Sequence, residues 1–368
     1  MTKNRIYLDY NATTPIRDQA IDAAMAAMKA VGNASSVHGF GRESRKMVED
    51  ARGHIAALVN VRPAQVIFNA GATEGNNTIL SGYAGKNIVV SAIEHPSVLE
   101  PSNNADKIPV TKSGVVDLDK LDIMLAASKT DLVSVQLVNS ETGVIQPIAD
   151  IATLAHKNGA LLHCDGVQAA GRIELDFKKL DVDFLTLSAH KFGGPQGAGA
   201  LIFREGLLLP KFMKGGGQEK RQRAGTENVA AIAGFGVAAR LAREELNDWQ
   251  TRLRGLQSRF ESGLKKVTND IVIIGENVPR VYNTTNVLLP GVPAETQLMA
   301  LDLEGVAVSS GSACSSGAFK PSHVLLAMGY GEDDAKSALR ISCGWATTET
   351  EIDAALAAYA KILARIRK

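Results

Sequence analysis

Several side chains that could do chemistry follow short apolar runs of the sequence, at the points where predicted strands end. Asp165 comes directly after the run ALLHC, His95 follows NIVVS, and Lys191 follows DFLTL within the stretch SAHKFGG. An acid placed directly after a buried strand is costly unless another group pairs with it. In sheets of parallel strands, ligands gather at the carboxyl ends, so we expect these three side chains at one rim.

The strand predicted for QVIF ends in NAGATEG, a glycine-to-threonine turn into a helix. Such a turn presents backbone N–H groups at a helix N-terminus, where an anion is favoured, and Thr73 adds a hydroxyl. The simpler alternative is an ordinary N-cap by Thr73, with Glu74 placed favourably for the helix dipole. Other polar residues also fall at strand ends. They are Asn139, Ser140 and Glu141 after LVSVQLV, Gln168 after ALLHC, and Ser188 and His190 after DFLTL.

Taken together, this rim offers an anion cradle, a carboxylate, a histidine, a hydroxyl and a lysine. Pyridoxal phosphate needs such a set, because its lysine must have a lowered pKa to act as a nucleophile. A carboxylate keeps the pyridine nitrogen protonated so that the ring can store electrons. A helix N-terminus takes the phosphate, and an imidazole can stack on the ring. The residues therefore predict a pyridoxal phosphate site that contains Lys191 and Asp165.

Cys314 lies in the run SSGSACSSG, between a predicted strand, LEGVAV, and a predicted helix start, KPSHVLLAMG. Serine, glycine and alanine favour a loop with easy backbone motion. The alternative is a loop cysteine without a role, but exposed free thiols are chemically hazardous without a use. The sequence therefore predicts a cysteine on a flexible segment between two ordered elements.

Three other motifs are discounted. SAHK has the spacing of serine-acyl enzymes but lacks the companion S-D-N and K-T-G motifs. GFGVAA, residues 234–239, resembles a dinucleotide-binding fingerprint without the acidic residue that should follow. His163, Cys164 and Asp165 could be metal ligands, but adjacent strand residues point to opposite faces, so we expect no metal site. Cys164 and Cys343 are expected in the core.

The bulk composition limits the classes of function. The chain has 368 residues, 45% of them hydrophobic, with 40 basic and 39 acidic side chains. This balance argues against a direct nucleic-acid partner, and no apolar run approaches the ~20 residues of a membrane span. The first fifteen residues lack the apolar core of a signal peptide, and three cysteines are too few for a disulfide framework. We therefore expect a cytoplasmic protein with reduced thiols.

Short apolar runs alternate with amphipathic stretches through the first two-thirds of the chain. For example, RESRKMVEDARGHIAALVN places Val48 and Ile55 at helical spacing. This alternation predicts an α/β fold, with a large domain whose mostly parallel sheet is sandwiched by helices. A long charged helix, shorter strands and a final helix then predict a smaller α+β domain. We place the large domain at residues 16–245, and the small domain, with the cysteine loop, at 1–15 and 246–368.

Ten stretches of the sequence resemble, in family order, the motifs of cysteine desulfurases of the NifS/IscS type. This family is a class-V aminotransferase branch of the fold-type I pyridoxal phosphate enzymes. Ten ordered matches are far more specific than any single one. The stretches run from residue 7 to about 345 and are YLDYNATTP, NASSVHGFG, GATEGNN, EHPSV, VNSETGVIQP, DGVQAAG, SAHKFGGPQG, GGGQEKRQRAGTENVA, VSSGSACSSG and ALRISCGW.

The resemblance implies roles for particular positions. Lys191 would bond covalently to the cofactor, His95 would stack on its ring and shuttle protons, and Cys314 would be the nucleophile. Arg340 would bind the substrate carboxylate, a bidentate task suited to guanidinium. Thr226 would reach the phosphate of a neighbouring subunit, which implies a homodimer. The other cofactor contacts implied by the resemblance are Ala72, Thr73, Ser188 and His190 at the phosphate, Asp165 at the pyridine nitrogen, and Gln168 and Ser140 at the ring hydroxyl.

The implied reaction converts L-cysteine to L-alanine, with the sulfur carried as a persulfide on Cys314 to an acceptor protein. Iron–sulfur cluster assembly and tRNA thiolation are both open as destinations. Within enzymes, the alternatives are a selenocysteine lyase or an aminotransferase on the same fold. A sulfur-handling binding protein without catalysis is a further alternative, but the presence of both Lys191 and Cys314 argues against it. Ser140 stands where the family often has a second asparagine, so the contact to the ring hydroxyl falls to a shorter side chain.

Overall fold

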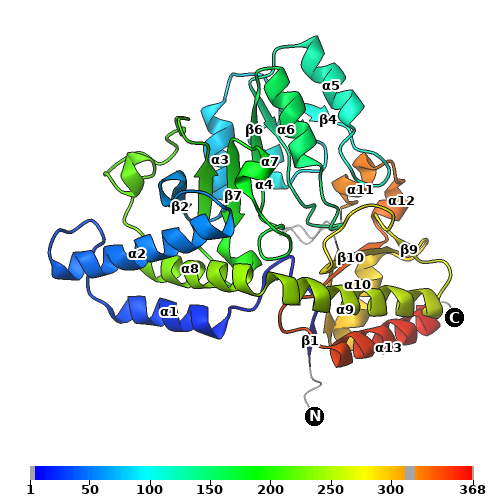
Figure 1. Ribbon diagram of the computed structural model, residues 1–368. Helices are drawn as coiled ribbons and strands as arrows, with labels where there is room; N and C mark the ends of the chain where they lie inside the picture. Colours follow the sequence, from blue (N-terminus) through cyan, green and yellow to red (C-terminus); the bar gives the residue numbers. More distant parts are fainter. Residues whose placement is uncertain (1–4, 311–319, 367–368) are drawn as a thin grey trace.

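The computed structural model describes residues 5–310 and 320–366, and a seven-stranded sheet forms the centre of its larger part (Figure 1). The strand order is β2-β8-β7-β6-β5-β3-β4, and only β8 runs antiparallel to its two neighbours. The prediction of an α/β fold with a mostly parallel sheet is confirmed. The strands are β2 (Val66–Asn69), β3 (Ile88–Ser91), β4 (Asp106–Ile108), β5 (Leu132–Ser134), β6 (Leu161–Asp165), β7 (Phe184–Ser188) and β8 (Gly199–Phe203).

The strands form where the sequence has near-continuous apolar runs, because both faces of this sheet are covered. The run LVSVQLV forms a shorter strand than predicted, since β5 ends at Ser134. The ladder nevertheless continues beyond it, because Val135 N–H donates to His163 O at 3.0 Å and Leu137 N–H to Asp165 O at 2.9 Å. Backbone pairing therefore carries the chain straight to the rim where the polar residues lie.

Helices cover both faces of the sheet. Alternate residues of one strand belong to different cores: Phe184 packs with residues of α3 and α4, and Leu185 packs with residues of α2, α5, α6 and α8. The predicted apolar stripe of α2 is confirmed, since Val48 and Ile55 are buried. The helices of this part are α1 (Asp18–Lys29), α2 (Gly39–Leu58), α3 (Ala72–Gly82), α4 (Pro96–Leu99), α5 (Leu118–Ala127), α6 (Ile148–Lys157), α7 (Phe177–Leu180) and α8 (Val229–Glu244).

A second sheet, antiparallel with the order β12-β13-β10-β9, lies beside the first in Figure 1, and a separate apolar core surrounds it. The predicted strand LEGVAV is shorter than expected, because Leu303 ends a helix and only Val306–Ala307 pair, with the N-terminal strand β1. The boundary at residue 245 stays a prediction. The elements are β1 (Ile6–Tyr7), α9 (Leu246–Val267), β9 (Val272–Ile273), β10 (Thr284–Leu288), α10 (Ala294–Leu303), β11 (Val306–Ala307), β12 (Ser309–Ser310), α11 (His323–Ala327), α12 (Glu332–Ala335), β13 (Ala338–Ser342) and α13 (Glu349–Ile366).

Among the helices of the described residues, none combines the length and the apolar character that crossing a membrane requires.

A buried ion pair fixes the turn η3 (Glu219–Arg221) to the edge of the large sheet. Arg52 of α2 donates from Nη1 and Nη2 to the two carboxylate oxygens of Glu219, both at 2.8 Å, and Glu219 also accepts from Phe68 N–H at 2.8 Å. The side chains are only 2% and 3% exposed. Because a charge buried without its partner is very unfavourable, each member of this pair requires the other.

Replacing Glu219 by alanine would remove both 2.8 Å bonds to the buried Arg52 guanidinium and leave it, among the described acids, only the longer contact, at 3.2 Å, with the exposed Glu49. We expect the free energy of unfolding, measured by urea denaturation, to fall by about 3–5 kcal/mol. Lys46→Ala is the matched control, because it removes the exposed i,i+4 pair with Asp50 on the same helix, and its loss should be below about 1 kcal/mol. Similar losses in the two variants would contradict the assignment of this pair as a structural anchor.

Candidate active site

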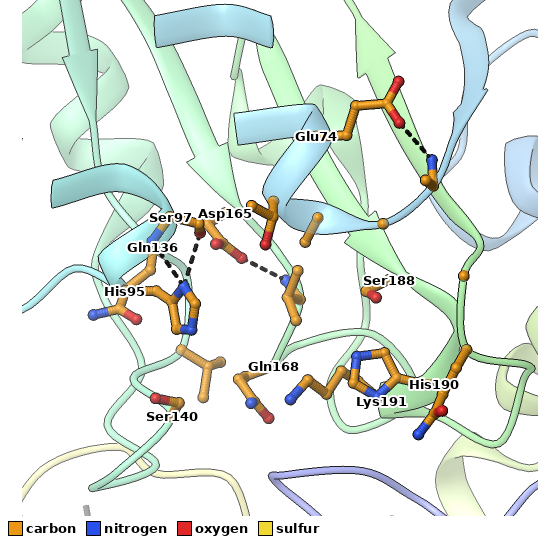
Figure 2. Close-up of a pocket in the computed structure, with 18 residues that line it drawn as sticks. Glu74, His95, Ser97, Gln136, Ser140, Asp165, Gln168, Ser188, His190 and Lys191 are labelled. Atoms are coloured by element: carbon orange, nitrogen blue, oxygen red, sulfur yellow. Dashed lines mark hydrogen bonds between the residues drawn. The ribbon is translucent and has the colours of Figure 1, made fainter. Parts of the chain in front are cut away.

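A pocket of about 560 Å³ opens at the carboxyl ends of the parallel strands, and Figure 2 shows the side chains that line it. Nine of the twelve predicted site residues lie here: Ala72, Thr73, His95, Ser140, Asp165, Gln168, Ser188, His190 and Lys191. They come from five separate segments of the chain. Parallel strands deliver these segments to one edge, as the sequence pattern predicts.

Lys191 ends the turn η2 (Ala189–Lys191), which directly follows β7. Its Nζ donates to two backbone carbonyls, Asn11 O at 2.7 Å and Ala12 O at 2.8 Å. Burial, followed by the nearby Arg172 and Arg340 guanidinium groups, lowers the pKa of Lys191 to about 8. The amine is therefore uncharged in a substantial fraction of molecules near neutral pH, as a nucleophilic lysine must be.

Asp165 ends β6 and is 7% exposed. Its Oδ2 accepts from Asn76 Nδ2 at 2.8 Å, and its Oδ1 accepts from Val167 N–H at 3.0 Å. These two donors fix the orientation of the carboxylate, which lines the pocket. Asn76, fully buried on α3, is a partner that sequence reasoning missed, although it lies in the quoted stretch GATEGNN.

The N-terminus of α3 forms a cradle above the pocket. Gly71 has φ = +147°, a left-handed conformation that L side chains rarely adopt. The first turn of the helix leaves the N–H groups of Ala72 and Thr73 without intrahelical acceptors. Glu74, the nearest acid, is held by Arg223 at 2.8 Å, which offsets its charge beside the cradle. The alternative of an N-cap by Thr73 is wrong, because Gly71 is the N-cap residue, no described side chain caps the helix, and Thr73 lies within α3. The predicted anion site is thus available in this geometry.

His190 directly precedes Lys191 in the turn η2 and lines the same pocket. Its Nδ1 is 3.2 Å from Thr13 Oγ1. Burial, and then the neighbouring Lys191 charge, lowers the pKa of His190 to about 4. The ring is therefore neutral at physiological pH and can donate or accept one hydrogen bond without adding a charge to the pocket.

His95 caps the N-terminus of α4 and faces the pocket from the opposite side (Figure 2). Its Nδ1 accepts from Ser97 N–H at 3.0 Å and is 2.8 Å from Ser97 Oγ. Burial lowers the pKa of His95, although the Asp165 carboxylate opposes the shift. The neutral ring therefore carries its hydrogen on Nε2, since Nδ1 is occupied as an acceptor.

Asn11 connects several of these residues and is the second group that sequence reasoning missed. Its carbonyl accepts from Gln168 Nε2 at 3.0 Å as well as from Lys191, and its Nδ2 donates to Ser140 O at 2.9 Å. The only sequence signal was its place in the stretch YLDYNATTP. Arg340, on β13, does not line the pocket, but its Nη1 donates to the same Ser140 carbonyl at 3.2 Å.

Besides Arg340, one other described site residue, Thr226, is not brought into this pocket. Thr226 lines a neighbouring pocket with Arg223 and Asn228, which shares Ala70 and Gly197 with the main one. A role on the partner subunit's cofactor, as the resemblance implies, is consistent with this separation but stays a prediction. Cys314 lies outside the described residues.

The donor set fits pyridoxal phosphate. It contains an amine of lowered pKa, a carboxylate fixed by two donors, a helix N-terminus that begins at a glycine of positive φ, and an imidazole on the other wall. Each of these is what one part of the cofactor requires. The discounted sequence GFGVAA lies inside α8, and Cys164 and Cys343 are both buried, as predicted.

Comparison with known proteins leads to the same family. Residues 6–355 match the model of the family described as aminotransferase class-V. The cysteine desulfurase IscS of Dictyoglomus turgidum is 39% identical, over 99% of this chain and 96% of its own length. The cysteine desulfurase IscS 1 of Archaeoglobus fulgidus is 38% identical, over 98% and 97%. An X-ray structure of a NifS-like protein from Rickettsia africae superposes with a TM-score of 0.93, at 39% identity, over 98% of this chain and 100% of its own.

The family match, the full-length relatives and the pocket agree on one assignment. Relatives at this identity and coverage share a fold, and nine of the residues predicted for a pyridoxal phosphate site line one pocket at the strand edge here. The chain therefore belongs to the cysteine desulfurases of the NifS/IscS type, within the class-V aminotransferase family of pyridoxal phosphate-dependent enzymes.

Proposed function

We propose that this protein releases the sulfur of L-cysteine as a persulfide on Cys314 and returns the carbon skeleton as L-alanine. The observation that carries the proposal is the pairing of the Lys191 amine, whose pKa is lowered to about 8, with the Asp165 carboxylate in one pocket. The relatives named cysteine desulfurase support the choice of substrate. When bound, pyridoxal phosphate draws electrons from the α-carbon of the attached amino acid.

The residues of the pocket would hold the cofactor by its two ends. Lys191 would bond to it covalently, and Asp165 would face the pyridine nitrogen from its fixed position between Asn76 and Val167. Ala72 and Thr73, with Ser188 and His190, would take the phosphate at the helix N-terminus. Gln168, together with Ser140, would contact the ring hydroxyl. Arg340 would bind the substrate carboxylate as a bidentate partner.

Proton transfer would be divided between Lys191 and His95. An uncharged Nζ can remove the α-proton as a general base, and its lowered pKa keeps it available near neutral pH. His95 carries its hydrogen on Nε2, because Ser97 N–H occupies Nδ1. His95 therefore acts best as a donor, and Lys191 is the better candidate for the base. Stacking of the His95 ring would also exclude water from that face.

Sulfur transfer requires the thiolate form of Cys314, and it needs no external oxidant or reductant. The Cys314 thiolate attacks the sulfur of the substrate, so that an S–S bond forms and the Cβ–S bond breaks. The electron pair of the broken bond stays with the carbon skeleton, which takes up a proton and leaves as alanine. The persulfide would then pass to an acceptor protein, for iron–sulfur cluster assembly or for tRNA thiolation.

Cys314→Ala should abolish the release of alanine from L-cysteine, by roughly three orders of magnitude or more, because the nucleophile is lost. The yellow absorption of the bound cofactor should remain. The control is Cys343→Ala, which removes a buried thiol and should retain turnover. Mass spectrometry of the native chain after incubation with L-cysteine should find one added sulfur on the Cys314 peptide. Keto acid in place of alanine, or full turnover in Cys314→Ala, would reject the proposal.

The active form is proposed to be a homodimer, located in the cytoplasm. Exposed apolar side chains occur on α1, on the segment that follows it and at the start of α2, including Met28, Val31 and Phe40. A pocket lined by Ser35 on one side and by residues 217–220 on the other connects this segment to the loop that leads to Thr226. Since Thr226 resembles a residue that reaches the neighbouring subunit's phosphate, a second copy of the chain is the occupant that fits this surface.

Met28→Glu should weaken the dimer by at least about tenfold, because a charge would be buried against the apolar surface of the second copy. The control is Met299→Glu, because Met299 is also an exposed methionine but lies on α10, a helix that packs beside the second sheet. Sedimentation velocity over a range of concentrations would compare the two variants. Equal association of both variants would argue against this interface.

A further inference from the structure

Four arginines are buried in the described part of the chain, and one of them differs from the rest. Arg17, Arg52 and Arg340 each form an ion pair with a carboxylate, from Glu245, Glu219 and Asp9 respectively. Arg172, which is 7% exposed, has no ion pair with any described carboxylate. A guanidinium buried without a counter-charge costs several kcal/mol, so its presence calls for a compensating use.

The hydrogen bonds of Arg172 all go to neutral groups. Its Nη1 donates to Gln168 O at 3.1 Å and also to Gln168 Oε1, and its Nη2 has no partner within the described residues. Gln168 in turn donates from Nε2 to Asn11 O at 3.0 Å, the carbonyl that also accepts from Lys191. Arg172 is thus connected to the lysine through Gln168 and the shared Asn11 carbonyl.

The Arg172 guanidinium lies on the side of Lys191 that faces away from the main pocket. Lys191 lines both the main pocket and a narrow second pocket, whereas Arg172 lines only the second, with Asn283 and Trp249. A charge in that position can act on the amine without occupying space needed by cofactor or substrate. Direct contact with either of them is therefore not its role.

We propose that Arg172 is a positioning residue of the active site, a buried positive charge that favours the uncharged form of the Lys191 amine and orients Gln168 toward the cofactor. The inference rests on the proposed pyridoxal phosphate chemistry of this pocket. Removal of the charge would reduce the fraction of uncharged lysine at neutral pH and slow its bonding to the cofactor. Arg172 has no acid partner in the described part of the chain, and this matters for Lys191. A carboxylate beside Arg172 would cancel much of the electrostatic effect of its charge on the lysine amine.

The charges around Lys191 agree with this role. Burial is the largest cause of its lowered pKa, and Arg172 is the next. Burial and the nearby Arg340 lower the pKa of Arg172 itself to about 9, which leaves Arg172 positively charged at neutral pH. The ionisable groups that act on Lys191 from the surrounding elements are Arg172, Arg340, Asp165 and Asp9, and the rings of His95 and His190 also interact with it.

The experiment measures the rate at which pyridoxal phosphate binds covalently to the chain, and not the rate of turnover. Pyridoxal phosphate is added to the full chain from which cofactor has been removed, and the rate at which the yellow band appears is measured from pH 6 to 10. In the native chain the rate should rise with pH to a midpoint of about 8. In Arg172→Met the midpoint should move upward by roughly one pH unit, which lowers the rate at pH 7 by about tenfold.

Arg172→Lys is the matched control, because it retains the charge, and its midpoint should stay near the native value. Arg172→Met should also be no less stable to heat than the native chain, since no ion pair is lost; Arg172→Gln serves as a second neutral variant. An unchanged midpoint in both neutral variants, or an equal shift in Arg172→Lys, would overturn the inference. A native chain that never develops the band would instead overturn the proposed function, and the inference with it.

Discussion

The chemistry of this pocket depends on how one amine is held. Lys191 Nζ is bound by the carbonyls of Asn11 and Ala12, residues 180 and 179 positions away in the chain. The same N-terminal stretch clamps the turn around the lysine, since Thr14 donates from N–H and Oγ1 to His190 O and accepts from Gly193 N–H. Carbonyls orient the amine but stabilise its charged form less than a carboxylate would. The lysine is therefore fixed in position and still able to lose its proton.

The second sheet takes part in this arrangement through Asn11. Asn11 N–H donates to Ser342 Oγ on β13, and its side chain bonds to Thr284 Oγ1 on β10 and to Asn283. The carbonyl that receives Lys191 is therefore held by both sheets, although the lysine itself belongs to the first. Docking of the second sheet is part of building the active site, and loosening that contact would disturb the amine before it unfolded the large sheet.

The sequence predicted the parts of the site that are local. Strands end at Asp165 and Ser188, and Lys191 lies in the turn after Ser188, because the alternation of strand and helix fixes where each strand stops. A parallel sheet then brings those ends together. Asn11 and Arg172 could not be found in that way. Asn11 matters because it contacts residues that are distant in sequence, and Arg172 because it lacks an acid partner among the residues that the structure describes. Neither property leaves a periodic pattern in the sequence. The turn residue Glu219 was missed for the same reason.

Arg340 illustrates how the two sheets could cooperate in substrate recognition. Its Nη2 is 2.7 Å from Asp9 Oδ1 and its Nη1 donates to Ser140 O, so that one residue from each side of the interface fixes the guanidinium plane. Its Nε is buried without a partner within the described residues. A guanidinium held in this way loses little further freedom when a carboxylate arrives, which favours binding in one orientation. If Arg340 binds the substrate carboxylate, as proposed, Asp9 would compete for the same guanidinium, and the site would discriminate against ligands without a carboxylate able to displace Asp9.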